Sequence, residues 1–169
     1  MAVTYDLIGS TVLTSTANSI TLSSIPSTFT SLRLITSTFG SNTATCRLQF
    51  NGDTGNNYGI QFMTYAGSAT PAANAVVNES GIYITGAQYG GSPTYPGLFI
   101  VDILGYASTT YMTAVNHCGG QAGGTGSSEW FQLGGAWYNT AVVNSLSLTR
   151  GSGTFNAGSS VRLYGIKGV

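Results

Sequence analysis

Residues 98–104 read Leu-Phe-Ile-Val-Asp-Ile-Leu, and this run decides the class of fold that the sequence specifies. Neighbouring residues of a β-strand point to opposite faces, so the run is apolar on both faces, as in a central or sandwiched strand. Its β-branched and aromatic residues also favour a pleated surface. The run contains an aspartate and is far too short to cross a bilayer. We therefore predict a β-strand here.

Asp102 is the polar residue inside this run. It shares a face with Leu98, Ile100 and Leu104, where a carboxylate needs a cation or several N–H donors. We expect either a structural ion pair with an arginine or a strand that twists out to solvent. Both alternatives are favoured over a catalytic role.

Outward from this run, apolar and polar residues alternate along the whole chain. Such alternation is typical of strands with one face on a core and one in solvent. The final segment, 160–169, has a strand pattern up to the end of the sequence, so we expect it to be paired into a sheet. The other alternating segments are 20–23, 32–34, 48–50, 60–62, 82–84, 146–148 and 161–163.

Clusters of Gly, Asn, Ser and Pro separate these segments. They supply the positive φ angles and fixed bends that tight turns need. The clusters are FGSNT (39–43), NGDTGNN (51–57), AQYGGSPTYPG (87–97), CGGQAGGTGSS (118–128) and RGSGTFNAGSS (150–160).

The fold prediction follows from strands and turns together. About ten candidate strands occur at the spacing of an antiparallel sandwich, and no window has the apolar stripe of a helix. We predict an all-β chain that forms one antiparallel β-sandwich domain over residues 1–169. Eight or more strands with long Gly-rich crossovers favour a jelly-roll-like sandwich over an immunoglobulin fold.

Charge is scarce and balanced. Only 6% of the residues are charged, and five basic residues offset five acidic ones. This composition argues against nucleic-acid, anionic-membrane and charged-substrate partners, because each would need clustered or excess charge. The N-terminal MAVTYDLIGS has no signal-peptide pattern. A neutral surface lacks the repulsion that keeps proteins apart, so it suggests an assembly component or a protein that works outside cells.

Catalytic motifs are not found. His117 and Cys118 are adjacent, so in a regular strand they point to opposite faces and cannot form a nucleophile–base pair. The glycine-rich stretch 119–126 lacks the context of a phosphate-binding loop. We expect no enzymatic activity and no cofactor. A glycosidase would need two acids about 5–10 Å apart, and the candidates are Asp53, Glu79, Asp102 and Glu129.

A metal site is not predicted either. The chain has one histidine and two cysteines, too few for a transition-metal site. The segment 51–57 is rich in oxygen and superficially similar to a calcium loop, but it holds one carboxylate where calcium usually takes several. We favour a Gly/Asn hairpin turn there. Cys46 and Cys118 are interpreted as small buried hydrophobic residues, with a disulfide bridge as the alternative.

Aromatic residues are the remaining surface signal. Tyr89 and Tyr95 lie in a Gly/Pro loop, and two aromatic pairs bracket the motif QLGGA. One interpretation is that they anchor the core or a subunit contact. The other is a platform for stacking on sugar rings. The candidate interface or glycan-contact residues are Tyr89, Tyr95, Trp130, Trp137 and Tyr138.

Three segments together resemble a known family. They are YDLIGSTVLTSTANSITLSSIPSTFTSLRLI (5–35), RLQFNGDTGNNY (47–58) and VVNSLSLTRGSGTFNAGSSVRLYGIK (142–167). Their pattern is similar to small virion structural proteins of tailed phages, notably phages of cyanobacteria and other aquatic bacteria. The closing segment is fairly specific and the opening one is degenerate. Region 66–135 carries no signature of the family.

The resemblance implies a jelly-roll-like sandwich that assembles as a homotrimer on the virion. Domains of this kind occur as capsid decoration (cement) proteins or as distal modules of tail fibres. The strand pattern begins almost at Met1 with no shaft segment before it, so we expect a decoration protein that binds the major capsid protein. Its expected location is the capsid surface, after assembly in the cytoplasm of the bacterial host. The alternative is a receptor- or glycan-binding module that uses loops 87–97 and 128–138.

Overall fold

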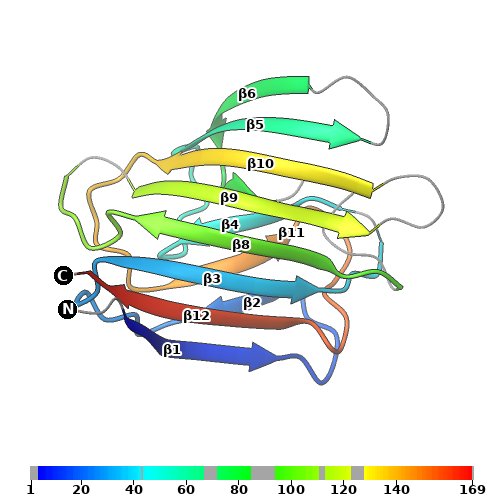
Figure 1. The fold of residues 1–169 in the computed structure, drawn as a ribbon, viewed down its shortest axis with the longest axis horizontal. Helices are drawn as coiled ribbons and strands as arrows, with labels where there is room; N and C mark the ends of the chain where they lie inside the picture. Colours follow the sequence, from blue (N-terminus) through cyan, green and yellow to red (C-terminus); the bar gives the residue numbers. More distant parts are fainter. Residues whose placement is uncertain are drawn as a thin grey trace.

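The fold consists of antiparallel β-strands in two sheets (Figure 1). The computed structural model describes residues 4–42, 44–66, 72–84, 94–110, 113–122 and 128–168, and twelve strands lie within these ranges. In sheet order, the larger sheet contains β1 (Thr4–Val12), β12 (Ser160–Lys167), β3 (Ser31–Thr38), β8 (Gly97–Leu104), β9 (Thr113–Ala122), β10 (Ser128–Trp137), β5 (Tyr58–Ala66) and β6 (Ala72–Glu79). The smaller sheet contains β2 (Ser19–Leu22), β11 (Leu146–Arg150), β4 (Cys46–Phe50) and β7 (Ile82–Tyr83).

The connections between the strands are those of a jelly roll. The order β1-β12-β3-β8 in one sheet faces β2-β11-β4-β7 in the other, so the chain passes repeatedly from sheet to sheet. Two additional strand pairs, β5–β6 and β9–β10, extend the larger sheet beyond β8 (Figure 1). The predicted all-β class and antiparallel, jelly-roll-like sandwich are therefore confirmed.

The core lies between the two sheets, and the alternating segments supply it. In β3, Leu32 and Leu34 are fully buried while the intervening Arg33 is partly exposed. Leu146 and Leu148 of β11 are also fully buried, and they enter the core from the smaller sheet. The largest fully buried side chains come from strands and loops alike and are Trp137, Tyr58, Tyr106, Phe50, Phe99, Phe155, Leu32, Leu34, Leu48, Ile82, Ile84 and Ile103.

The run at 98–104 forms β8, which pairs with β3 on one side and β9 on the other. It is central in the sheet, as predicted. Phe99, Val101 and Ile103 point into the core and are at most 2% exposed. The residues between them point away from the smaller sheet, so only one face of the strand is sandwiched.

The turn at 51–57 has the predicted Gly/Asn chemistry but is not a hairpin. Asn51 and Gly52 have φ angles of 52° and 69°, and the Asp53 N–H donates to the Phe50 carbonyl at 2.9 Å, as in a type I′ turn. However, β4 pairs with β11 and β7, whereas β5 pairs with β10 and β6. The hairpin prediction is wrong because the turn carries the chain from one sheet to the other.

The predicted turn at 118–128 is also wrong at both ends, where the structure has strand residues. Cys118–Ala122 continue β9, and Ser128 already belongs to β10. β9 is hydrogen-bonded on both sides, to β8 and β10, and this pairing outweighs the weak strand propensity of its glycines. Residues 123–127, and residues 87–93 of the predicted 87–97 turn, lie outside the described ranges.

The two ends of the described chain lie side by side. Thr4 of β1 pairs with Lys167 of β12, and β12 also pairs with β3. The predicted pairing of the C-terminal segment is thereby confirmed. No helix in the described part of the chain could span a bilayer.

Candidate functional site

The candidate site is the outer face of the larger sheet, meaning the face that points away from the smaller sheet. On β8 this face carries Leu98, Ile100 and Leu104, which are 53%, 47% and 43% exposed. Residues paired across antiparallel strands lie on the same face, which extends the surface to β1 and β12. We call the part over β1, β12, β3 and β8 the apolar zone; its exposed apolar side chains are Tyr5, Leu7, Val12, Leu98, Ile100 and Leu104.

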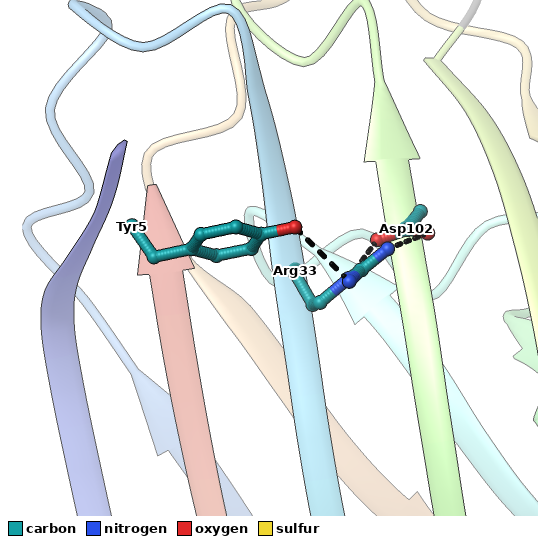
Figure 2. Close-up of polar contacts among 3 residues, drawn as sticks. All are labelled: Tyr5, Arg33 and Asp102. Atoms are coloured by element: carbon teal, nitrogen blue, oxygen red, sulfur yellow. Dashed lines mark hydrogen bonds and ion pairs between the residues drawn. The ribbon is translucent and has the colours of Figure 1, made fainter. Parts of the chain in front are cut away.

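An ion pair lies in the middle of the apolar zone. Arg33 donates from Nε to Asp102 Oδ1 at 2.6 Å and from Nη2 to Oδ2 at 2.7 Å, a bidentate geometry set by the direct pairing of the two residues across β3 and β8. Arg33 also donates to the Tyr5 hydroxyl at 3.2 Å (Figure 2). The predicted ion pair of Asp102 with an arginine is therefore confirmed.

The environment of this pair favours the charged form of Arg33. The hydrogen bonds to Asp102 raise the pKa of Arg33, against the opposing effect of partial burial. The Tyr5 ring reaches across β12 from β1, and the guanidinium carbon lies 5.6 Å from its centroid (Figure 2). The apolar zone thus holds an acid and a base that neutralise each other, together with Arg162 of β12, which is exposed on the same face and pairs with Ile35 of β3.

A groove occupies the other part of the outer face, over β10, β5 and β6. It consists of two hollows of about 610 and 290 Å³, which share Gln61, Ala75 and Gly134. Its polar side chains include Gln61 and Gln132, and small residues form much of its lining. The lining of the two hollows comprises residues 59–63, 73–77, 115, 132–136 and 138.

Tyr138 lies at one end of the groove, over Gly59. A Cβ atom on Gly59 would lie 2.3 Å from the Tyr138 hydroxyl oxygen, so only glycine leaves room for the ring there. The Tyr138 side chain is 42% exposed. The groove therefore has an aromatic end wall that is supported from below by the sheet.

The structure separates the aromatic residues proposed from the sequence. Tyr138 lines the groove, and the side chains of both Tyr138 and Tyr95 are exposed. Tyr89 lies outside the described residues. Trp130 is described only as a backbone position of β10, opposite Tyr65.

Trp137 is a core residue and not a surface contact, which corrects one candidate. Its side chain is 1% exposed, and its ring lies 5.5 Å from Phe50 and 6.3 Å from Tyr58, between centroids. The reason is strand parity, because Trp137 shares the inward face of β10 with Leu133, while the next residue, Tyr138, points outward.

The Asp53 carboxylate holds the indole of Trp137. Its carboxylate accepts hydrogen bonds from Trp137 Nε1 at 2.8 Å, from the Gly55 N–H at 2.8 Å and from Asn57 Nδ2 at 3.1 Å. Partial burial acts to raise the pKa of Asp53, but these hydrogen bonds outweigh it and lower the pKa. Among the described residues, no three His, Cys, Asp or Glu side chains are grouped as metal ligands.

The other acids considered for a glycosidase pair have separate partners. Glu79 accepts a short hydrogen bond from the Tyr83 hydroxyl, and Asp102 is bound by Arg33. Asp53 contacts Trp137, as above. The side chain of Glu129 lies outside the described part of the structure.

Cys46 is a buried residue of β4, as the sequence predicts for a small hydrophobic side chain. Burial raises the pKa of its thiol to about 12. Cys118 belongs to β9 in the other sheet. The side chains of Cys118 and His117 lie outside the described residues, so neither the predicted burial of Cys118 nor its pairing is tested.

The sequence did not single out the groove residues. Gln61, Gln132 and Gly134 come from two strands that are far apart in the chain, and only the register of β5 with β10 brings them together. The sequence motif QLGGA (132–136) forms the β10 side of the groove, and in the sequence only the aromatic residues around it stand out.

Comparisons with protein-family models, with curated proteins and with solved structures found no match.

Proposed function

We propose that this chain is a structural protein of a tailed-phage virion: a homotrimeric capsid decoration (cement) protein that binds the major capsid protein and stabilises the assembled head. The similarity of segments 5–35, 47–58 and 142–167 to phage structural proteins supports the assignment to a tailed-phage virion. The apolar zone carries the proposal that the chain works by surface contact, because three β8 residues there are 43–53% exposed and flank an internally neutralised ion pair.

The apolar zone supports assembly for an energetic reason. Contiguous exposed apolar surface is uncommon on soluble monomers and marks interaction sites, because its removal from water is favourable. Leu98 and Ile100 are neighbours on the outer face of β8, and Leu104 follows on the other side of Asp102. Association of copies through this zone buries them and leaves the Arg33–Asp102 pair compensated.

The proposed trimer would stabilise the head for two reasons: it makes several contacts at once, and it binds the assembled shell in preference to free capsid subunits. A threefold trimer presents three copies of the same patch, and simultaneous contacts with neighbouring capsid subunits add through effective concentration. A protein that binds only the assembled shell stabilises that shell. With 6% charged residues, these contacts are mainly apolar and neutral hydrogen bonds, so they depend weakly on salt. No catalytic step is part of this role.

Light scattering after size exclusion tests the assembly. The wild-type chain is expected to have three times its 17.4 kDa mass, and Ile100→Asp is expected to be monomeric with an unchanged fold by circular dichroism. Val77→Asp is the matched control, because Val77 is 65% exposed on β6 and lies outside the apolar zone. A monomeric wild type, or an Ile100→Asp trimer, contradicts the proposal.

A receptor- or glycan-binding module of the virion is the second candidate. The observation that favours it is the groove with Tyr138 at its end. It predicts that the wild-type protein binds glycans on an array. It also differs from the decoration role in location, since a receptor-binding module is expected on the tail or exposed on the capsid surface.

A further inference from the structure

We propose that the groove over β10, β5 and β6 binds a neutral oligosaccharide, with Tyr138 as the stacking platform and the amides of Gln61 and Gln132 as hydrogen-bonding groups. This inference deepens the second candidate function by assigning its site and ligand class. It does not depend on the apolar zone, which lies over other strands of the same face.

The two glutamines are placed to act together. Gln132 pairs with Met63, and Gln61 pairs with Gly134, so the glutamines are diagonal neighbours on adjacent strands. Diagonal residues on a sheet face are about 7–8 Å apart. Both side chains are exposed, and neither has a hydrogen-bond partner among the described residues. Each amide can donate and accept, which matches the hydroxyl groups of a sugar.

Gly134 is a second, independent sign of a ligand. A Cβ atom there would meet no atom within 4 Å, and the residue has no positive φ. Neither packing nor backbone conformation therefore requires glycine at this position. Glycine inside a strand weakens it, and often marks a place where a ligand approaches the backbone closely. At Gly134 it keeps the floor of the groove low, directly opposite Gln61.

Tyr138 supplies the apolar contact that sugar recognition needs. Its ring end rests on Gly59, where a Cβ atom would lie 2.3 Å from the hydroxyl oxygen and 3.0 Å from Cζ. The sheet thus fixes one side of the ring while a substantial part stays exposed. A tyrosine in this position offers an apolar surface to sugar C–H groups and a polar tip to their hydroxyls.

Charge and size define the class of ligand. The described side chains that line the two hollows are all uncharged, so this lining offers no cation for a sulfate, phosphate or uronic acid and no acid for an amine. The larger hollow, about 610 Å³, lies within the ~300–1,000 Å³ range of small-molecule sites. A short chain of neutral hexoses fits both properties.

A substitution that fills the groove without harming the fold tests this inference. Neutral oligosaccharides that bind the wild type on an array are titrated calorimetrically against Gly134→Val, Tyr138→Ala and the double variant Gln61→Ala/Gln132→Ala. We expect each variant to bind at least tenfold more weakly. Ser10→Val is the control, because Ser10 is exposed on β1, away from the groove. Valine suits a strand, so Gly134→Val is expected to melt no lower than the wild type.

The outcomes separate this inference from the assembly proposal. Sugar binding that survives Gly134→Val, a wild type that binds no neutral glycan, or binding confined to sulfated and acidic glycans overturns the inference. A change of molar mass caused by Gly134→Val also overturns it, because the groove would then be a contact between copies. Ile100→Asp is expected to keep sugar binding whether or not the chain is a trimer.

Discussion

Replacement of Asp53 by alanine tests how the crossover from β4 to β5 is held. In the native structure the Asp53 carboxylate accepts the buried indole N–H of Trp137 at 2.8 Å and also binds Gly55 and Asn57 in its own loop. Trp137 is 1% exposed and packs on Phe50, so Asp53→Ala leaves a buried indole N–H without the acceptor that it has in the native structure. We expect Asp53→Ala to destabilise the fold while the protein stays a β-sandwich.

The expected loss in the free energy of unfolding depends on how deeply each hydrogen-bond donor to Asp53 is buried. A buried donor without a partner costs about 1–3 kcal/mol, and this applies to the Trp137 indole. The Gly55 N–H and the Asn57 amide are exposed and regain water, so their loss adds up to about 1 kcal/mol. The sum is about 1–4 kcal/mol, which lowers Tm by about 2–16 °C in a protein of this length.

Thermal melts followed by circular dichroism measure this effect. Asn57→Ala is the matched control, because it removes one exposed donor from the same carboxylate and is expected to cost less than about 1 kcal/mol. If Asp53→Ala melts within about 2 °C of the wild type, the carboxylate does not hold the indole and the reasoning is refuted.

The same contacts predict acid sensitivity. The hydrogen bonds of Asp53 outweigh the effect of its partial burial and lower its pKa in the folded state. The folded state therefore gains stability from the ionised carboxylate above the unfolded pKa, near ~4, and loses it as the pH falls through the lower folded pKa. The stability difference between wild type and Asp53→Ala is expected to shrink below about pH 4.

Three further predictions concern packing, the buried thiol and the ion pair. Gly40→Ala would place a Cβ atom 2.3 Å from Arg150 Cζ and is expected to cost about 1–3 kcal/mol in denaturant melts, whereas Gly151→Ala, with its nearest atom at 3.7 Å, is expected to change stability by less than about 0.5 kcal/mol. The Cys46 thiol is buried and its pKa is about 12, so a thiol reagent at pH 8 is expected to label it only after unfolding, as mass spectrometry of labelled peptides would detect. Asp102→Asn is expected to lower the stability of the monomer by less than about 1 kcal/mol, because the ion pair is partly exposed. In light scattering the same variant is expected to dissociate the proposed trimer, because Arg33 loses its counter-ion in the apolar zone.

Strand positions could be predicted from the sequence because the alternation of apolar and polar residues is a local signal. Leu32 and Leu34 point into the core on either side of Arg33, as their spacing indicates. The pairing of Asp102 with an arginine could be predicted as a class of contact, since a carboxylate among apolar residues needs a cation. The identity of that arginine could not, because the register of β3 with β8 depends on the whole sheet.

The sites on the outer face depend on how strands that are far apart in the sequence pair with each other. The Asn51–Gly52 turn is encoded locally, but whether it joins paired strands or crosses between sheets is decided by where β4 and β5 find partners. Trp137 and Tyr138 are adjacent and both aromatic, and only the orientation of β10 decides which one is buried. The groove needs the register of β10 with β5, which no motif in the sequence specifies.

A density map of the virion that carries this protein tests the central claim most directly. The account predicts trimers on the capsid surface, with the β8 side chains Leu98, Ile100 and Leu104 buried between copies or against the major capsid protein. A map that places the chain at the tail tip, or on the capsid as single copies with this face of β8 open to solvent, would contradict it.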